Sequence, residues 1–312
     1  MSLLGTCVRG LLSLVGSVPP RRALALGSML GRAHARAGSF RVRDARRNIA
    51  LAFPDMGEAE RESILVESFA SLGRALADVA LLGGRHRAQL LAGLRIEGRA
   101  NLEEALEAGR GAFIATAHLG SWELAGVALA QAGWPLVAVQ HETEPEWLAE
   151  IVESWRVSGG MELATLGHAG RDVLRALDRG KVVALLLDQN ADRESGVFAP
   201  FFGEPACTRA GAVRLAMRRG IPILPAFCVR VSQGLEHEIR IEPPLELGRS
   251  LEGNVARVNA AIEAAIRRSP EQWLWAHRRF RTRPEGAPRI YPSRRAHRVR
   301  RATRSAEPPT DR

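Results

Sequence analysis

The stretch of residues 111–126 constrains the fold more than any other part of this chain. Residues 112–117 form a continuous run of small and apolar side chains of strand length, and His118 follows them directly. A glycine two residues later permits a tight turn, and Ser121 can cap a helix over residues 122–132. The pattern predicts a buried strand that ends at His118 and turns into a helix.

The spacing of His118 and Glu123 restricts how the two side chains can meet. Five helical steps rotate by about 500°, which places such side chains about 140° apart on one continuous helix. They can therefore meet only if His118 precedes the helix. A turn would let the Glu123 carboxylate reach one imidazole nitrogen and leave the other free to take a proton. The pattern favours a general base with an orienting carboxylate and no protein nucleophile.

The alternatives for this pair are structural or metal-binding. A histidine and a glutamate at this spacing often occur together by chance, and a histidine that ends a strand can be a hydrogen-bonded structural residue. The zinc protease pattern is His-Glu-x-x-His, and no second histidine follows His118 at ligand spacing. We therefore expect no metal and no cofactor at this site.

A second polar junction lies further along the chain. Residues 181–187 form a very apolar run that predicts a strand. Three polar residues follow it: Asp188, Gln189 and Asn190. Ligands of open α/β sheets gather at the carboxyl ends of strands. Asp188 is therefore expected to reach the same crevice as His118, where it could position a substrate or an arginine. It could equally do no more than cap the following turn.

The basic composition indicates an anionic partner. The formal net charge is +10, and of 44 basic residues only Lys181 is a lysine. Arginine pairs bidentately with phosphate and carboxylate groups, so nucleic acid, anionic lipid headgroups and an acidic carrier protein are the candidates. Nucleic acid is disfavoured, because the chain has one tyrosine, no zinc spacing and no RNP-like run. The three scattered cysteines suit structural thiols in a reducing compartment.

The motif from His118 to Glu123 resembles the His-x4-Asp/Glu block of the bacterial lauroyl/myristoyl (late lipid A biosynthesis) acyltransferase family, in the lysophospholipid acyltransferase superfamily. Three later segments resemble the family's later blocks in the same order: Asp188 to Asn190, residues 196–203 with Thr208, and residues 270–280. The resemblance implies an α/β fold with a mixed central sheet flanked by helices. It also implies a glycerolipid acyltransferase-like architecture with an N-terminal membrane-associated helical region.

The resemblance further implies that the protein is an O-acyltransferase. A fatty acyl group would pass from an acyl thioester, on acyl carrier protein or coenzyme A, to a hydroxyl of a lipid A precursor or related glycolipid. His118 would be the general base and Glu123 would stabilise the imidazolium, without a covalent acyl-enzyme. The alternatives are a lysophospholipid or other glycolipid acceptor, a non-catalytic peripheral membrane protein, and a hydrolase. The sequence contains no Gly-x-Ser-x-Gly motif of the kind a serine hydrolase uses.

Seven residues are expected at the substrate: Arg156, Asp188, Gln189, Phe201, Phe202, Thr208 and Arg230. Arg156 resembles an arginine of the family that is thought to contact substrate phosphate, and it could also be a plain surface residue. Arg230 could hold a second phosphate. The run 198–203 is apolar where a loop would be polar, which favours a wall of the site over the membrane or the core. Thr208 can cap a helix over residues 209–219 with its amides toward the crevice.

The first forty residues are expected to associate with a membrane. Residues 1–18 are apolar but interrupted, and they fall short of the roughly 20 apolar residues of a spanning helix. A removable signal peptide also fits poorly, because no clear small-residue cleavage site follows. Residues 21–37 combine apolar residues with arginines, which favours a helix in the membrane interface over an ordinary surface helix. The predicted location is the cytoplasmic face of the inner membrane, with the protein peripheral or monotopic.

The chain is expected to form one acyltransferase domain over residues 41–283, between the segment 1–40 and a basic disordered tail over 284–312. The block 270–280 combines tryptophans with arginines, so it could lie at the membrane interface or lock onto the core. Hydrophobic spacing predicts the remaining elements: helices over 43–53, 58–82, 101–107, 146–157, 170–178 and 251–268, strands over 94–97, 135–140 and 221–229, and an edge strand over 235–241.

Overall fold

The protein is built around a seven-stranded mixed sheet. The computed structural model describes residues 3–140, 146–165 and 169–292. The strands lie in the order β1 (Leu94–Glu97), β9 (His237–Ile241), β8 (Ile223–Arg230), β2 (Ala112–Thr116), β5 (Val182–Leu186), β3 (Leu136–Gln140) and β4 (Glu162–Thr165). Neighbouring strands are parallel except β8 and β9, which are antiparallel. The predicted α/β fold with a mixed central sheet is confirmed.

Two details of the sheet differ from the prediction. The strand predicted at the edge, β9, is an inner strand, because β1 pairs with it on its outer side. The hydrophobic pattern of a strand indicates which of its side chains are buried, but it does not indicate which strands lie beside it in the sheet. β4 was not predicted, because its sequence Glu-Leu-Ala-Thr lacks the alternation of apolar and polar residues that β1 shows in Leu-Arg-Ile-Glu.

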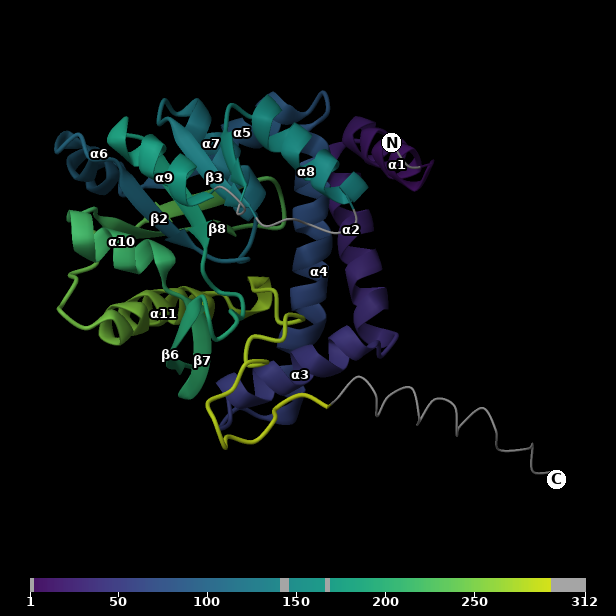
Figure 1. The fold of residues 1–312 in the computed structure, drawn as a ribbon. Helices are drawn as coiled ribbons and strands as arrows, with labels where there is room; N and C mark the ends of the chain where they lie inside the picture. Colours follow the sequence, from purple (N-terminus) through teal and green to yellow (C-terminus); the bar gives the residue numbers. More distant parts are fainter. Residues whose placement is uncertain (1–2, 141–145, 166–168, 293–312) are drawn as a thin grey trace.

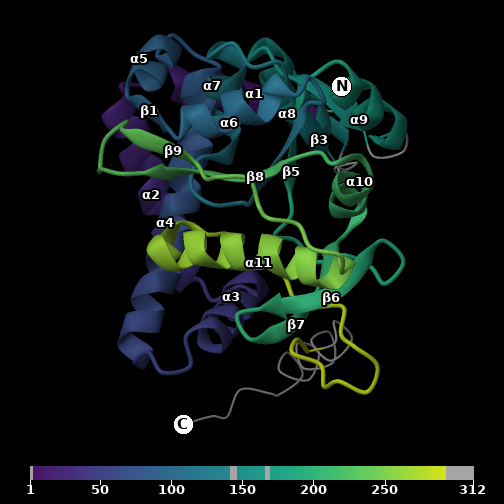
Figure 2. The ribbon, with the colours of Figure 1, turned by 90° about the vertical axis from the view of Figure 1, so that its left-hand side faces the viewer.

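Both faces of the sheet are covered by helices. Successive side chains of a strand point to opposite faces, and in the inner strands the side chains on both faces are apolar and need to be buried. In β2, Phe113 and Ala115 belong to one hydrophobic core, and Ala112 and Ile114 belong to the other. Helices cover the two faces: α6 (Arg99–Glu107) and α7 (Trp122–Gln131) on one, and α11 (Leu251–Arg268) on the other (Figure 2). Among the other helices, α5 (Arg87–Ala92) precedes β1, and three lie between later strands along the chain: α8 (Glu146–Ser158), α9 (Ala169–Asp178) and α10 (Gly211–Arg219).

Four N-terminal helices pack beside the sheet: α1 (Leu3–Ser17), α2 (Pro20–Arg36), α3 (Phe40–Ala52) and α4 (Glu58–Leu82) (Figure 1). α2 and α4 lie side by side and approach closely where Gly27 meets Gly73. A Cβ at Gly27 would lie 2.2 Å from the Gly73 carbonyl oxygen, so the contact has no room for a side chain. Within the described part of the chain, no helix combines the length and the apolar character needed to cross a membrane.

The phenylalanine-rich run, expected to be a loop, is a hairpin of β6 (Gly196–Phe201) and β7 (Glu204–Arg209). Its turn is formed by Phe202 and Gly203, which both have positive φ angles. Two-residue hairpin turns usually have the sequence Asn-Gly or Asp-Gly. Here the first turn residue is a phenylalanine with a φ of 50°, so the turn could not be recognised from the sequence. Thr208 lies within β7, and α10 begins only at Gly211. The predicted capping role of Thr208 is therefore wrong.

The tryptophan-rich block packs into the core. After the short 3-10 helix η1 (Pro270–Gln272), Trp273, Trp275 and Phe280 are each at most 2% exposed. The alternative that placed this block at a membrane interface is therefore wrong, and the core alternative is confirmed.

The folded domain extends beyond its predicted end at residue 283. The Tyr291 hydroxyl donates to Asn48 Oδ1 at 2.6 Å, and it accepts the backbone N–H of Phe280 at 3.2 Å. The Tyr291 side chain is buried. The predicted tail therefore begins too early, and residues 293–312 of it lie outside the described residues.

Candidate active site

His118 and Asp188 lie side by side at the carboxyl edge of the sheet. β2 and β5 are parallel neighbours with Thr116 opposite Leu186, and each of the two polar residues stands two positions beyond its strand. His118 Nδ1 lies 2.9 Å from Asp188 Oδ1, and the His118 backbone N–H donates to Oδ2 at 3.0 Å. The expectation that both strands lead to one crevice is confirmed.

Asp188 is a buried carboxylate that is ionised at neutral pH. It also accepts the indole N–H of Trp273 at 2.8 Å. Burial would raise its pKa, but the charge of His118 and the hydrogen bonds from His118 and Trp273 lower the pKa to about 2. The ionised carboxylate holds the imidazole proton on Nδ1, which leaves Nε2 as an acceptor. In this structure the Gln189 amide nitrogen lies 3.3 Å from Nε2 and donates to it.

Glu123 contacts Arg156 and not His118. Arg156 donates from Nε to Glu123 Oε2 at 2.9 Å, and a terminal guanidinium nitrogen donates to Oε1 at 2.6 Å. Burial disfavours the charge on Arg156, but the hydrogen bonds and charge of Glu123 outweigh it and raise the Arg156 pKa. The predicted contact between His118 and Glu123 is therefore wrong, and Asp188 is the carboxylate that orients the histidine. Arg156 is held by the protein's own carboxylate.

Arg230 belongs to a buried charge cluster rather than to an open phosphate site. Its guanidinium donates to Asp78 Oδ2 at 2.5 Å, and only 7% of the side chain is exposed. His237 Nε2 lies 3.2 Å from the same oxygen, and the Ser121 hydroxyl also donates to it. Burial would raise the pKa of Asp78, but the hydrogen bond to His237 and the charge of Arg230 hold it below its usual value. The predicted phosphate contact of Arg230 is wrong.

The two phenylalanines predicted at the substrate lie in the core behind the site. The ring of Phe201 packs against Trp273 with 5.7 Å between centroids, and the ring of Phe202 packs against Trp275 at 5.9 Å. Both phenylalanines are buried and neither lines the cavities described below. The prediction of a site wall is therefore wrong. The packing instead fixes Trp273, the indole donor to Asp188.

Thr208 supports the site through Arg279. The Arg279 guanidinium donates to Thr208 Oγ1 at 2.5 Å and to the carbonyl oxygen of Gln189 at 3.3 Å. Burial lowers the pKa of Arg279 to about 10, so it stays charged at neutral pH. Thr208 is thus a buried part of the scaffold behind Gln189, and the predicted substrate contact is wrong.

The segment after α11 frames the site, a role that was not predicted from its sequence. The Leu274 backbone N–H donates to the His118 carbonyl oxygen at 3.0 Å. The Asn190 backbone N–H donates to His277 Nε2 at 3.0 Å. Burial lowers the His277 pKa to about 4, so this acceptor is neutral at pH 7. The role could have been suspected from the resemblance, because the segment 270–280 and the segment from Asp188 to Asn190 both resemble blocks of the same family.

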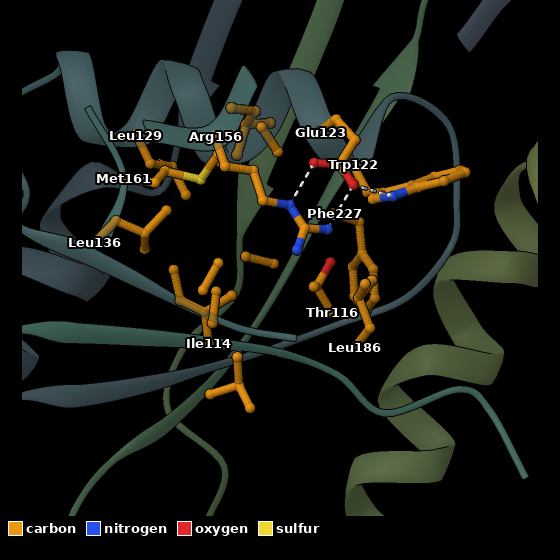
Figure 3. Close-up of a pocket in the computed structure, with 17 residues that line it drawn as sticks. Ile114, Thr116, Trp122, Glu123, Leu129, Leu136, Arg156, Met161, Leu186 and Phe227 are labelled. Carbon is orange, nitrogen blue, oxygen red and sulfur yellow. Dashed lines mark hydrogen bonds and ion pairs between the residues drawn. The ribbon is translucent and has the colours of Figure 1, made fainter. Parts of the chain in front are cut away.

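An inner cavity of about 60 Å³ lies between the sheet and α7 (Figure 3). Trp122, Glu123 and Arg156 border it near the site. Leu129, Leu136 and Met161 lie at the opposite end in Figure 3. Apart from the Glu123–Arg156 pair and Thr116, its lining side chains are apolar.

An outer groove of about 700 Å³ opens between the N-terminal helices. Its apolar lining comes from α1, α2 and α4, and its inner end includes Gln189, Leu274 and His277. His118 touches a lining residue of each space. Its ring packs against Trp122 of the inner cavity with 5.1 Å between centroids, and its Nε2 contacts Gln189 of the outer groove. The histidine therefore lies between an inner cavity and an outer groove that both have mainly apolar linings.

Comparisons with known proteins agree with the motifs. The family model described as bacterial lipid A biosynthesis acyltransferase matches residues 4–282. The lipid A biosynthesis palmitoleoyltransferase of Escherichia coli (strain K12) is 32% identical over 79% of this chain and 81% of that protein. The lauroyltransferase of the same organism is 29% identical over 90% of this chain and 92% of that protein.

A further relative, which matches a smaller share of the chain, acts on a phosphatidylinositol mannoside according to its name. The phosphatidylinositol mannoside acyltransferase of Mycobacterium tuberculosis (strain CDC 1551 / Oshkosh) is 30% identical over 70% of this chain and 69% of that protein. The resemblance found in the sequence motifs is confirmed. The chain belongs to the bacterial lipid A biosynthesis acyltransferase family, whose members are O-acyltransferases.

Proposed function

We propose that this protein transfers a fatty acyl group from an acyl thioester to a hydroxyl of a lipid A precursor, with His118 as the general base. The observation that carries the proposal is the position of the His118–Asp188 pair between the inner cavity and the outer groove. The inner cavity, about 60 Å³ in this structure, would widen to take the acyl chain of the donor, and the outer groove of about 700 Å³ would take the chains of the acceptor. The thioester and the hydroxyl would then meet at Nε2.

The proton transfers follow from the orientation of the imidazole. The acceptor hydroxyl replaces the Gln189 amide at His118 Nε2, and its proton passes to Nε2 as its oxygen attacks the thioester carbonyl carbon. The ionised Asp188 stabilises the imidazolium through Nδ1. Collapse of the tetrahedral intermediate breaks the carbon–sulfur bond, and the imidazolium returns the proton to the leaving thiolate.

The start of α7 supplies donors for the negative oxygen of that intermediate. The helix begins at Trp122, four residues after His118, and the Ser121 side chain makes no capping hydrogen bond to it. Backbone N–H groups in the first turn of a helix have no partner within the helix. Such preorganised donors stabilise an oxyanion.

The surroundings of His118 favour direct transfer over an acyl-enzyme. The Ser121 hydroxyl donates to the buried Asp78 carboxylate, away from the histidine. Cys228 is fully buried, and burial raises the pKa of its thiol well above the usual range. Among the described residues, no hydroxyl or thiol group contacts His118 Nε2. The acceptor hydroxyl is then the nucleophile.

The exposed apolar side chains beside the outer groove suit a protein that works at a lipid surface. Five of them are more than half exposed: Leu11, Leu14, Met29, Leu30 and Leu76. These apolar side chains would be buried in the surface of a bilayer, and the net charge of +10 would attract anionic lipid. Both features favour peripheral association with the cytoplasmic face of the inner membrane. The same charge would attract an acidic acyl carrier protein, although coenzyme A is also an anionic donor.

Met161 should control the length of the acyl chain that is transferred. It closes the end of the inner cavity that lies away from Trp122 (Figure 3). Met161→Ala would deepen the cavity by a few carbon atoms, so kcat/KM for a donor two carbons longer should rise about tenfold relative to the donor preferred by the wild type. Competition between labelled thioesters of different length measures this ratio.

The matched control for this prediction is Met217→Ala. Met217 is a partly buried methionine on α10 that packs on the opposite core. Its replacement should leave the preference for chain length unchanged. An unchanged preference in a folded Met161→Ala variant would place the donor chain elsewhere.

The proposed function is tested by turnover with a labelled acyl thioester, on carrier protein or coenzyme A, and a panel of acceptors. The panel contains a lipid A precursor, a phosphatidylinositol mannoside and a lysophospholipid. We expect acylated lipid A precursor from the wild type and a loss of about 10²- to 10⁴-fold in kcat for His118→Ala. His86→Ala, a histidine before α5 outside both cavities, should retain activity. Release of free fatty acid without an acceptor would indicate a hydrolase, and no turnover at all would refute the proposal.

A further inference from the structure

The outer groove carries positive charge and no carboxylate. Its lining is apolar apart from four polar or basic side chains: His34, Arg41, Gln189 and His277. No aspartate or glutamate belongs to the described lining. A groove of this kind combines room for hydrocarbon chains with attraction for an anionic group.

Arg41 is the groove's strongest cation, and its charge is unpaired among the described residues. It lies in the first turn of α3, is exposed, and stacks on the neighbouring Phe40 ring with 5.2 Å from the guanidinium carbon to the ring centre. Within the described chain it makes no salt bridge. The other arginine that lines a cavity, Arg156, is paired with Glu123. An anion entering the groove would therefore meet a guanidinium with free donors.

Arg41 shares the outer groove with a residue that contacts the reacting histidine. His277 lines the same groove as Arg41. His277 Nε2 accepts the backbone N–H of Asn190, and the preceding residue, Gln189, contacts His118 Nε2. An acceptor headgroup bound at Arg41 would therefore lie in the outer groove, which is also the side from which Gln189 reaches His118 Nε2 and from which the reacting hydroxyl would approach.

We infer that Arg41 binds the phosphate of the acceptor lipid, whose chains lie in the outer groove, and so selects phosphorylated over uncharged acceptors. This inference rests on the proposed function. Arginine suits the task because its planar fork can donate two hydrogen bonds to one phosphate group. The exposed ends of the groove at Leu11, Leu26, Leu30 and Leu76 connect it to the lipid surface that would deliver the acceptor.

The test compares one acceptor with and without its phosphates. The probe is a lipid A precursor in micelles of a neutral detergent, used intact and after phosphatase treatment. For the wild type, kcat/KM should favour the phosphorylated form. In Arg41→Gln the KM for the phosphorylated form should rise roughly ten- to hundredfold, and the ratio of kcat/KM between the two forms should fall toward one.

Arg43→Gln is the matched control. Arg43 is an exposed arginine on the same helix that donates to the Gly38 carbonyl oxygen at 2.9 Å and does not line the groove. It should leave the ratio unchanged. An equal rise in KM in both variants would indicate bulk attraction to the micelle and would overturn the inference. An unchanged ratio in Arg41→Gln would also overturn it.

Binding without turnover separates this inference from the proposed function. The His118→Ala variant, alone and combined with Arg41→Gln, is titrated with micelles that contain the intact or the dephosphorylated lipid. Weaker binding of the intact lipid alone in the combined variant supports the inference even if the wild type acylates no acceptor. Equal binding by the two variants refutes it.

Discussion

Asp188→Asn should lower kcat by about two to four orders of magnitude while the protein remains folded. Asparagine keeps the shape of the side chain but removes the charge that holds the imidazole proton on Nδ1. It also places an amide donor among three existing donors, which are the backbone N–H and Nδ1–H of His118 and the indole N–H of Trp273. The imidazole would then favour the tautomer with its proton on Nε2, which cannot accept the proton of the acceptor.

Asp192→Asn is the matched control, since it makes the same chemical change in the same loop. The Asp192 side chain is exposed and accepts hydrogen bonds from the backbone and hydroxyl of Ser195, away from His118. Its replacement should leave kcat within about a factor of two. Steady-state kinetics with thermal unfolding of each variant distinguish lost catalysis from lost structure. Wild-type kcat in a folded Asp188→Asn variant would remove Asp188 from the mechanism.

The sequence was sufficient to find the two strands that meet at the site. The apolar runs before His118 and Asp188 have strand length, and polar residues at the ends of two neighbouring parallel strands share one edge of the sheet. It was not sufficient to choose the carboxylate that contacts His118. Spacing left Glu123 possible, but the turn before α7 directs Glu123 toward Arg156 on α8. That outcome depends on a tertiary contact with a residue 33 positions away.

The same reason explains the errors at the arginines and the phenylalanines. Arg230 was expected to bind phosphate because it ends a strand, but its partner Asp78 is 152 positions away on α4. Phe201 and Phe202 were expected beside the substrate because a polar loop was expected there. The hairpin β6–β7 instead turns both rings onto Trp273 and Trp275. Local patterns predicted most elements, while the pairing of buried charges and rings depends on the packing of distant elements.

Arg230→Met should lower the free energy of unfolding by about 3–5 kcal/mol, because it leaves a buried carboxylate without its cation. Asp78 is 1% exposed, and His237 and Ser121 are its remaining partners. Unfolding in urea measures the change. Arg219→Met removes an exposed ion pair with Asp178 and should cost at most about 1 kcal/mol.

The double variant Asp78→Asn/Arg230→Met tests whether the loss comes from the isolated charge. Removing the charge of Asp78 as well should recover part of the stability, because the penalty for a buried, unpaired carboxylate then disappears. If Arg230 instead binds the phosphate of the substrate, a different result is expected. An arginine whose role is to bind substrate can be replaced without loss of stability. Unaltered unfolding of Arg230→Met, together with a raised KM for the acceptor, would therefore return Arg230 to the substrate site.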